Sequence, residues 1–242
     1  MRYDFAIVYF GMTRSTKKVY KTHIDKLFNQ LRYNRLTYKT FIHTWKTNDN
    51  KQNVWQNSIK QEIDYEEYAL LYPDFYKLEN QDEFIKNIDM NDYFYKDCWD
   101  KLGDDCNGEW LPGLIRNHLC ALESKKRGLV MVEEFVKEGN EFKYVIFVRP
   151  DVFIKDALPL NQIFSQSYDI YLPNHSHNEG YNDRFAILNY DKASIYGKRI
   201  DEIVEFRRNN GRIVSEKYVK FIIEKYKLRL KLIDFDFKII RP

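Results

Sequence analysis

The chain has 242 residues, of which 44% are hydrophobic and 17% aromatic, and its 39 basic and 36 acidic side chains leave a net charge of +3. Such a composition excludes a disordered or collagen-like protein and predicts a folded core that needs neither disulfides nor structural metal. The near-neutral charge does not favour a nucleic-acid partner. No apolar run approaches the roughly 20 residues of a membrane span.

The three cysteines form no Cys-x-x-Cys motif, which favours free thiols in a reducing compartment. The first residues read as part of a strand rather than as a secretory signal. We therefore expect a cytoplasmic protein without an integral membrane segment. The usage of Lys, Asn, Ile and Tyr indicates an AT-rich genome, which fits a large virus or a low-GC bacterium. We expect one domain over residues 1–242.

The first elements alternate between strand and helix. The apolar run 3–10 ends at Gly11 and predicts a buried strand. Ser15 is a candidate N-cap for the helix that follows, in which apolar residues recur at three-and-four spacing up to Leu31.

The next segments are less regular. A second strand is expected at 39–45, a short helix at 54–62 and a third strand at 68–72, stopped by Pro73. Residues 74–109 are acidic and aromatic and predict an irregular insertion of short helices and loops along one edge of the fold.

The second half repeats the alternation. A long helix is expected from about Leu111, and Ser215 is a candidate N-cap for a later one. The helical residues His23 and His118 lie on apolar faces, which predicts core or core-edge positions. The further expected strands are 143–148, 169–172, 184–188 and 229–235.

This alternation predicts an α/β fold with three layers (α/β/α) and a mostly parallel, doubly wound sheet. In such sheets the ligand crevice lies at the carboxyl ends of the strands. Three polar segments follow expected strands and are therefore candidates for this crevice: Gly11–Arg14, His43–Lys46 and Arg149–Asp151.

The segment Tyr144–Asp151 delivers a cation and a carboxylate to a strand end, where Pro150 stiffens the turn. Asp151 is a candidate ligand for a divalent cation, and Arg149 is a candidate partner for phosphate oxygens. The alternative is structural: Asp151 caps a turn and Arg149 makes an ordinary salt bridge.

A polar loop before the expected strand 184–188 contains His175, His177, Glu179, Asn182 and Asp183. The two histidines lack a third-ligand pattern, so they are a weak indication of zinc. Asp183 is the stronger candidate because a strand anchors it directly. The alternative is a solvated loop with Asn–Asp turn chemistry.

Four residues are candidate contacts to a nucleotide. Gly11, Thr13 and Arg14 precede a helix, whose N-terminal N–H groups attract phosphate, and Thr44 ends the second strand. The segment matches neither a P-loop nor a Gly-x-Gly-x-x-Gly fingerprint, and it equally fits a plain helix start.

The order and spacing of five segments resemble a glycosyltransferase-like family of the GT-A type, the nucleotide-diphospho-sugar transferase fold, with members in large DNA viruses, bacteria and algae. The resemblance extends over about residues 3–242 and is weakest in 74–109. The segments are Lys39–Trp45, Tyr144–Asp151, Gly180–Ile187, Ser215–Tyr218 and Asp236–Pro242.

The resemblance implies a GT-A-like fold and transfer of a sugar from a UDP- or GDP-sugar to a glycan or another hydroxyl acceptor. It places Asp151 where such enzymes carry an Asp-x-Asp motif that holds Mn²⁺ or Mg²⁺ on the donor diphosphate. Here the motif reads Arg149-Pro150-Asp151, so a single carboxylate remains. The resemblance also implies that Asp183 is the general base of an inverting enzyme.

Two other functions fit the residues. A non-catalytic carbohydrate-binding or scaffold protein on the same fold agrees with the incomplete acidic motif. A nucleotidyltransferase is the weakest alternative, because the chain lacks a Gly-rich, basic opening segment.

Overall fold

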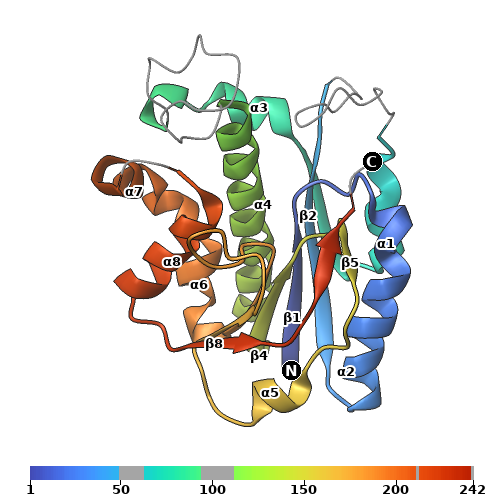
Figure 1. Cartoon of the computed structure of the whole chain (residues 1–242). Helices are drawn as coiled ribbons and strands as arrows, with labels where there is room; N and C mark the ends of the chain where they lie inside the picture. The colour runs from blue at the N-terminus through green and yellow to red at the C-terminus, as the bar shows by residue number, and fades with distance from the viewer. Residues whose placement is uncertain (49–62, 94–111, 211–212, 241–242) are drawn as a thin grey trace.

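The computed structural model describes residues 1–48, 63–93, 112–210 and 213–240; the helix expected at 54–62 lies outside them. Its centre is a seven-stranded sheet with the order β3-β2-β1-β4-β7-β6-β8, and a two-stranded sheet pairs β5 with β9 (Figure 1). The strands are β1 Arg2–Phe10, β2 Tyr38–Lys46, β3 Phe75–Asn80, β4 Glu141–Val148, β5 Val152–Ile154, β6 Ile170–Pro173, β7 Phe185–Asn189, β8 Leu230–Ile233 and β9 Phe237–Ile239.

The large sheet is mostly parallel, as predicted. Strand β1 pairs in parallel with β2 and β4, β2 with β3, and β6 with β8. Strand β7 runs antiparallel to both of its neighbours, β4 and β6. Because β7 is antiparallel to β4, β7 begins at the edge of the sheet where β4 ends.

Helices cover both faces of the sheet, which gives the expected three layers (Figure 1). Helices α1 and α2, joined by a π-helical turn at Ile24–Phe28, lie on one face, and the 26-residue helix α4 lies on the other with α6 and α8. The helices are α1 Thr16–His23, α2 Asn29–Tyr33, α3 Gln81–Lys86, α4 Pro112–Lys137, α5 Leu160–Phe164, α6 Ala193–Gly197, α7 Ile203–Asn210 and α8 Ser215–Lys225.

The central strand β1 shows why both faces are covered. Its residues alternate between two apolar clusters: Phe5 and Tyr9 pack toward the α1 side, whereas Ala6 and Phe10 pack toward α4. Because neighbouring side chains of a strand point to opposite faces, a continuous apolar run requires cover on both. The histidines His23 and His118 are both buried, as predicted.

The expectation of a third strand at 68–72 is wrong. Residues Tyr65–Leu71 form a 3₁₀-helix, which buries Tyr68 and Leu71 at the three-residue spacing of that helix. The edge strand β3 follows Pro73, within the segment expected to be an irregular insertion, and its Phe75 ring stacks on Phe41 of β2 at 5.0 Å. A cross-strand aromatic pair therefore stabilises a strand that the sequence pattern does not show.

Neither expected serine cap forms. Ser15 precedes α1, but its hydroxyl is buried and makes no side-chain capping bond. Helix α8 begins at Ser215 itself, after Val214, and the Ser215 hydroxyl donates to Glu216 Oε2 at 2.7 Å. A serine at a helix start thus marks the boundary here without capping it.

The sheet brings distant segments to one edge. Phe10 of β1 is paired with His43 of β2, and Val148 of β4 with Phe185 of β7. Strands β1, β2 and β4 end at this edge, and the antiparallel β7 begins there, so Asp183 comes to the same place. No helix within the described residues is long and apolar enough to cross a membrane.

Candidate active site

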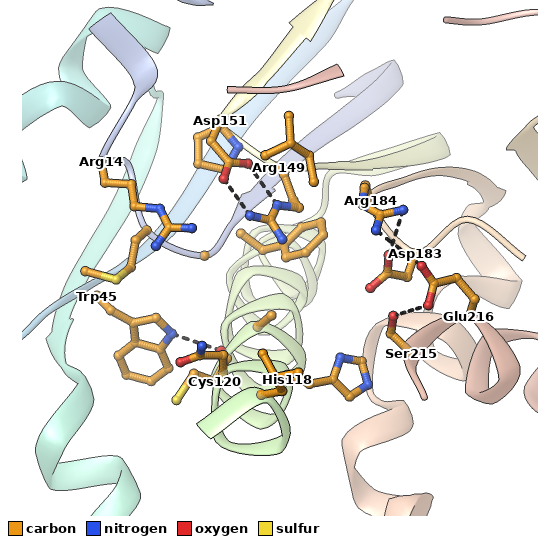
Figure 2. Close-up of a pocket in the computed structure, with 18 of the residues that line it drawn as sticks. Arg14, Trp45, His118, Cys120, Arg149, Asp151, Asp183, Arg184, Ser215 and Glu216 are labelled. Atoms are coloured by element: carbon orange, nitrogen blue, oxygen red, sulfur yellow. Dashed lines mark hydrogen bonds and ion pairs between the residues drawn. The ribbon is translucent and has the colours of Figure 1, made fainter. Parts of the chain in front are cut away.

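A pocket of about 460 Å³ opens at this edge of the sheet (Figure 2). Its wall combines the loop after β1, the end of β2, helix α4, the turn between β4 and β5, the loop before β7 and the start of α8. Segments from both halves of the chain thus meet around one cavity, the usual arrangement of a ligand site in an open α/β sheet.

Five of the seven site residues expected from the sequence line this pocket: Gly11, Arg14, Arg149, Asp151 and Asp183. Asp151 and Asp183 line the same pocket although they are 32 positions apart in the sequence (183 − 151). The hydrogen bond from the Arg149 main-chain N–H to the Arg184 carbonyl (3.2 Å) joins their two segments directly. The roles of these residues stay predictions.

Thr13 and Thr44 are placed differently. Both are buried, neither lines the pocket, and neither hydroxyl has a hydrogen-bond partner in the described structure. The expectation that they contact a nucleotide stays a prediction, although the structure places them behind the pocket wall. Gly11, Arg14 and Arg149 do line the pocket.

Arg149 and Asp151 form a two-pronged ion pair. Arg149 Nε donates to Asp151 Oδ1 at 2.8 Å and Nη2 donates to Oδ2 at 2.5 Å (Figure 2). Burial alone would raise the pKa of Asp151, which is 1% exposed, but the charge and hydrogen bonds of Arg149, with Arg14 nearby, hold it below its ordinary value. Asp151 is thus an anion that orients Arg149.

Asp183 lies beside a second arginine. Its Oδ1 is 3.7 Å from Arg184 Nη1, and its side chain is 17% exposed. Burial raises its pKa, but Arg184, followed by His118, Lys125 and Arg149, lowers it below the ordinary aspartate value overall. Asp183 is therefore a carboxylate at neutral pH that solvent and ligands can reach.

Glu216, at the start of α8, belongs to the same wall and was not among the expected site residues. Its Oε1 accepts from Arg184 Nη2 at 3.2 Å and from Asn178 Nδ2 at 3.1 Å, and its side chain is 3% exposed. Arg184 therefore bridges Asp183 and Glu216 (Figure 2). The available signal was the Ser215–Tyr218 segment, which the sequence marks as a helix start and as one of the five segments of the resemblance.

The metal implied by the resemblance has few ligands here. Among the described residues, no group of three or more His, Cys, Asp and Glu side chains could hold a metal ion. The loop histidines His175 and His177 form no such group either. The expectation of Mn²⁺ or Mg²⁺ at Asp151 stays a prediction, and the described residues fit it poorly because Arg149 engages both Asp151 oxygens.

Comparison with known proteins bears on the fold only. No family model matches the chain, and no curated protein matches its sequence. Solved structures with a similar fold include glycosyltransferases.

One is a glycosyltransferase involved in the glycosylation of the major capsid of PBCV-1, with 9% identity, 96% of this chain and 82% of that chain covered, and a TM-score of 0.42. Another is mouse xyloside xylosyltransferase 1 in its apo form, with 9% identity, coverage of 97% and 86%, and a TM-score of 0.45. The glycosyltransferase GlyE of Streptococcus pneumoniae TIGR4 has 10% identity, coverage of 96% and 45%, and a TM-score of 0.39. Similarity at this level assigns no residue of the site, whose chemistry follows from its own geometry.

Proposed function

We propose that this protein is a glycosyltransferase that transfers a sugar from a UDP- or GDP-sugar to a hydroxyl group of a glycan or another acceptor. One observation carries the proposal: a single pocket at the carboxyl edge of the sheet combines Arg14 and Arg149 with the accessible carboxylate of Asp183. Sugar transfer requires both kinds of group, cations for a departing diphosphate and a base for an acceptor hydroxyl.

The arginines suit the donor side of the reaction. When the bond between the sugar and the diphosphate breaks, negative charge develops on the departing phosphate oxygen. A guanidinium held in advance by its neighbours stabilises that charge without reorganising. Arg149 meets this condition because Asp151 fixes it through two hydrogen bonds.

Asp183 suits the acceptor side. Among the described carboxylates that line the pocket it is the most exposed: its side chain is 17% exposed, against 3% for Glu216 and 1% for Asp151. Its lowered pKa makes it a weak base in the empty pocket. The negative charge of a bound diphosphate raises that pKa again, because a nearby like charge disfavours the carboxylate.

The proposed step is a displacement at the anomeric carbon. The acceptor oxygen attacks that carbon as its proton passes to Asp183, and the bond to the diphosphate oxygen breaks. Attack on the face opposite the leaving group inverts the configuration. The nucleoside diphosphate leaves with the electron pair of the broken bond, and Asp183 returns its proton to solvent.

The Asp183→Asn variant tests this role. Asparagine keeps the shape of the side chain but cannot accept the proton, so we expect transfer to fall about 10²–10⁴-fold. Binding of the matching nucleoside diphosphate, measured by calorimetry, should remain. UDP- and GDP-sugars with a set of hydroxyl acceptors are the substrates to assay.

The matched control is Asp191→Asn, since Asp191 is 67% exposed and pairs with Lys192 outside the pocket. This variant should transfer sugar like the wild type. A folded Asp183→Asn protein with unchanged transfer would remove Asp183 from the base role.

The alternative is a carbohydrate-binding or scaffold protein on the same fold. The observation in its favour is that Asp151, the position implied for metal binding, is engaged by Arg149. Binding of saccharides without any affinity for UDP or GDP, and without transfer from any nucleotide sugar, would support this alternative.

A further inference from the structure

Each carboxylate that lines the pocket in the described part of the chain has a guanidinium partner. Asp151 is paired with Arg149, and both Glu216 and Asp183 are paired with Arg184. A divalent cation binding to any of the three would compete with an existing ion pair. The pocket therefore presents arginine side chains, rather than bare carboxylates, to an entering anion.

Asp151 shows this most clearly. Both of its oxygens accept hydrogen bonds from Arg149, and its side chain is 1% exposed. Mg²⁺ loses its water reluctantly and usually keeps several water ligands, so a carboxylate that binds it needs an accessible face. A carboxylate that is almost fully covered and bound on both oxygens offers none.

Arg149 is arranged differently. The pair with Asp151 uses Nε and Nη2, which leaves Nη1 outside that pair, and the side chain is 28% exposed at the pocket wall. A guanidinium stays charged at any accessible pH and matches the geometry of phosphate oxygens. Arg14, on the loop after β1, lines the same pocket near Asp151 (Figure 2).

We infer that arginine side chains hold the donor's diphosphate here, with Asp151 acting as the anchor that orients Arg149 and not as a metal ligand. The inference rests on the proposed function, since it concerns the same donor site. Arg149 contacts the diphosphate directly, and Arg14 supplies a second positive charge. Asp151 is a positioning residue.

The test is calorimetric titration of the full chain with UDP and with GDP, in EDTA and then in excess Mn²⁺. The inference expects one of these nucleotides to bind in EDTA, with a dissociation constant that Mn²⁺ changes by no more than about threefold. Binding that is lost in EDTA and restored by Mn²⁺ would overturn the inference and leave the proposed function standing. No binding of either nucleotide under either condition would overturn the proposed function itself.

Two substitutions of Arg149 separate the effect of its two-pronged guanidinium geometry from the effect of its positive charge. Arg149→Met removes both and should weaken nucleotide binding in EDTA by about 30-fold or more. Arg149→Lys keeps the charge but loses the two-pronged geometry, so binding should also weaken, by about tenfold. Binding in EDTA that neither substitution weakens would overturn the inference.

The matched control is Arg229→Met, because Arg229 is 61% exposed and pairs with Asp169 away from the pocket. Its nucleotide binding should equal that of the wild type. Asp151→Asn supplies a second readout, with thermal unfolding as the check on folding. The inference expects Asp151→Asn to bind the nucleotide more weakly than the wild type, with no recovery in Mn²⁺. If the wild type binds only in Mn²⁺ and Asp151→Asn loses that Mn²⁺-dependent binding, Asp151 is instead a metal ligand.

Discussion

Lys125 Nζ donates a hydrogen bond to the main-chain carbonyl of Asp183 over 3.4 Å, although Lys125 is 1% exposed. Its Nζ also lies 4.2 Å from the ring centroid of Phe10 and 4.5 Å from that of Tyr196. Two aromatic faces and a carbonyl oxygen thus surround the buried Nζ atom of Lys125 in the middle of α4. Lys125 ties the turn that carries the proposed base to the helix beneath the pocket.

Lys125→Met tests this tether. Methionine fills the space between the rings but cannot hold the Asp183 carbonyl. We expect sugar transfer to fall about 10²-fold, because small displacements of a reacting group have effects of that size. The free energy of unfolding at pH 7 should fall by no more than about 1 kcal/mol, or rise, since replacing a buried ionisable group by an apolar side chain is often neutral or stabilising.

The pH dependence gives an independent readout. Burial, together with the charges of Arg199 and Arg149, lowers the pKa of Lys125 well below its ordinary value despite the opposing effect of Asp183. Between the lowered pKa of the folded state and the ordinary lysine pKa, the unfolded chain therefore binds more protons than the folded chain. Wild-type stability rises with pH over that range. Lys125→Met should lack this rise in urea unfolding experiments.

Lys126→Met is the control for the tether. Lys126 is the next residue of α4, is 31% exposed and pairs with Asp201 at 2.5 Å, outside the pocket. It should transfer sugar at the wild-type rate. A folded Lys125→Met protein that transfers sugar as fast as this control would show that the contact with Asp183 has no functional role.

The burial of His23 should make the free energy of unfolding fall as the pH is lowered. Its Nε2 lies 2.8 Å from the Val152 carbonyl and its Nδ1 3.0 Å from the Tyr9 hydroxyl, so the neutral ring is satisfied on both nitrogens with Nε2 donating and Nδ1 accepting. Burial lowers the pKa of His23 to about 4, against the smaller opposing effects of Val152 and Asp151. Below the ordinary histidine value of about 6.5, the unfolded chain therefore binds a proton that the folded chain excludes.

The stability that His23 contributes is complete above about pH 6.5 and is lost as the pH falls toward 4. Between pH 7 and pH 5 this loss amounts to about 2 kcal/mol. In the His23→Gln variant, which does not titrate, the difference between the unfolding free energies at these two pH values should be smaller by that amount. An unchanged difference in urea unfolding would contradict the assignment of this pH dependence to His23.

The parts of the fold that the sequence predicts correctly are long and strongly patterned. Strands β1 and β4 contain continuous apolar runs, β2 is a long buried strand, and α4 repeats apolar residues over many turns. Strands β5 and β9 have three residues each, too few for a pattern, and pair only because the C-terminal segment folds back beside residues 152–154. Short elements depend on contacts between segments that are distant in the sequence.

In the site, too, features set by the local sequence can be predicted, whereas those set by contacts between distant segments cannot. Arg149 and Asp151 could be predicted because they follow a buried strand directly. The placement of Asp183 in the same pocket as Asp151 could not be predicted, since it depends on β7 running antiparallel to β4, and no residue pattern gives a strand its direction. Lys125 was missed because the rings that bury it come from β1 and α6, far from it in the sequence.

Gly180, in the loop that carries Asp183, lies directly against the main chain of α8. A Cβ atom at this position would overlap the carbonyl oxygen of Glu216 and lie 2.5 Å from the Lys217 nitrogen. The loop is tied to α8 there, because the Tyr181 N–H donates to the same carbonyl at 3.0 Å. Gly180→Ala must therefore push the loop away from the helix.

We expect Gly180→Ala to lower the free energy of unfolding by about 1–3 kcal/mol, the usual effect of forcing a side chain into a packed site. Sugar transfer should fall with it, because the shift separates Arg184 from Glu216 and moves Asp183. Ser176→Ala, at an exposed position of the same loop, should change neither quantity. Urea unfolding and initial transfer rates measure both, and a Gly180→Ala protein with wild-type stability would show that the loop does not need this close approach to α8.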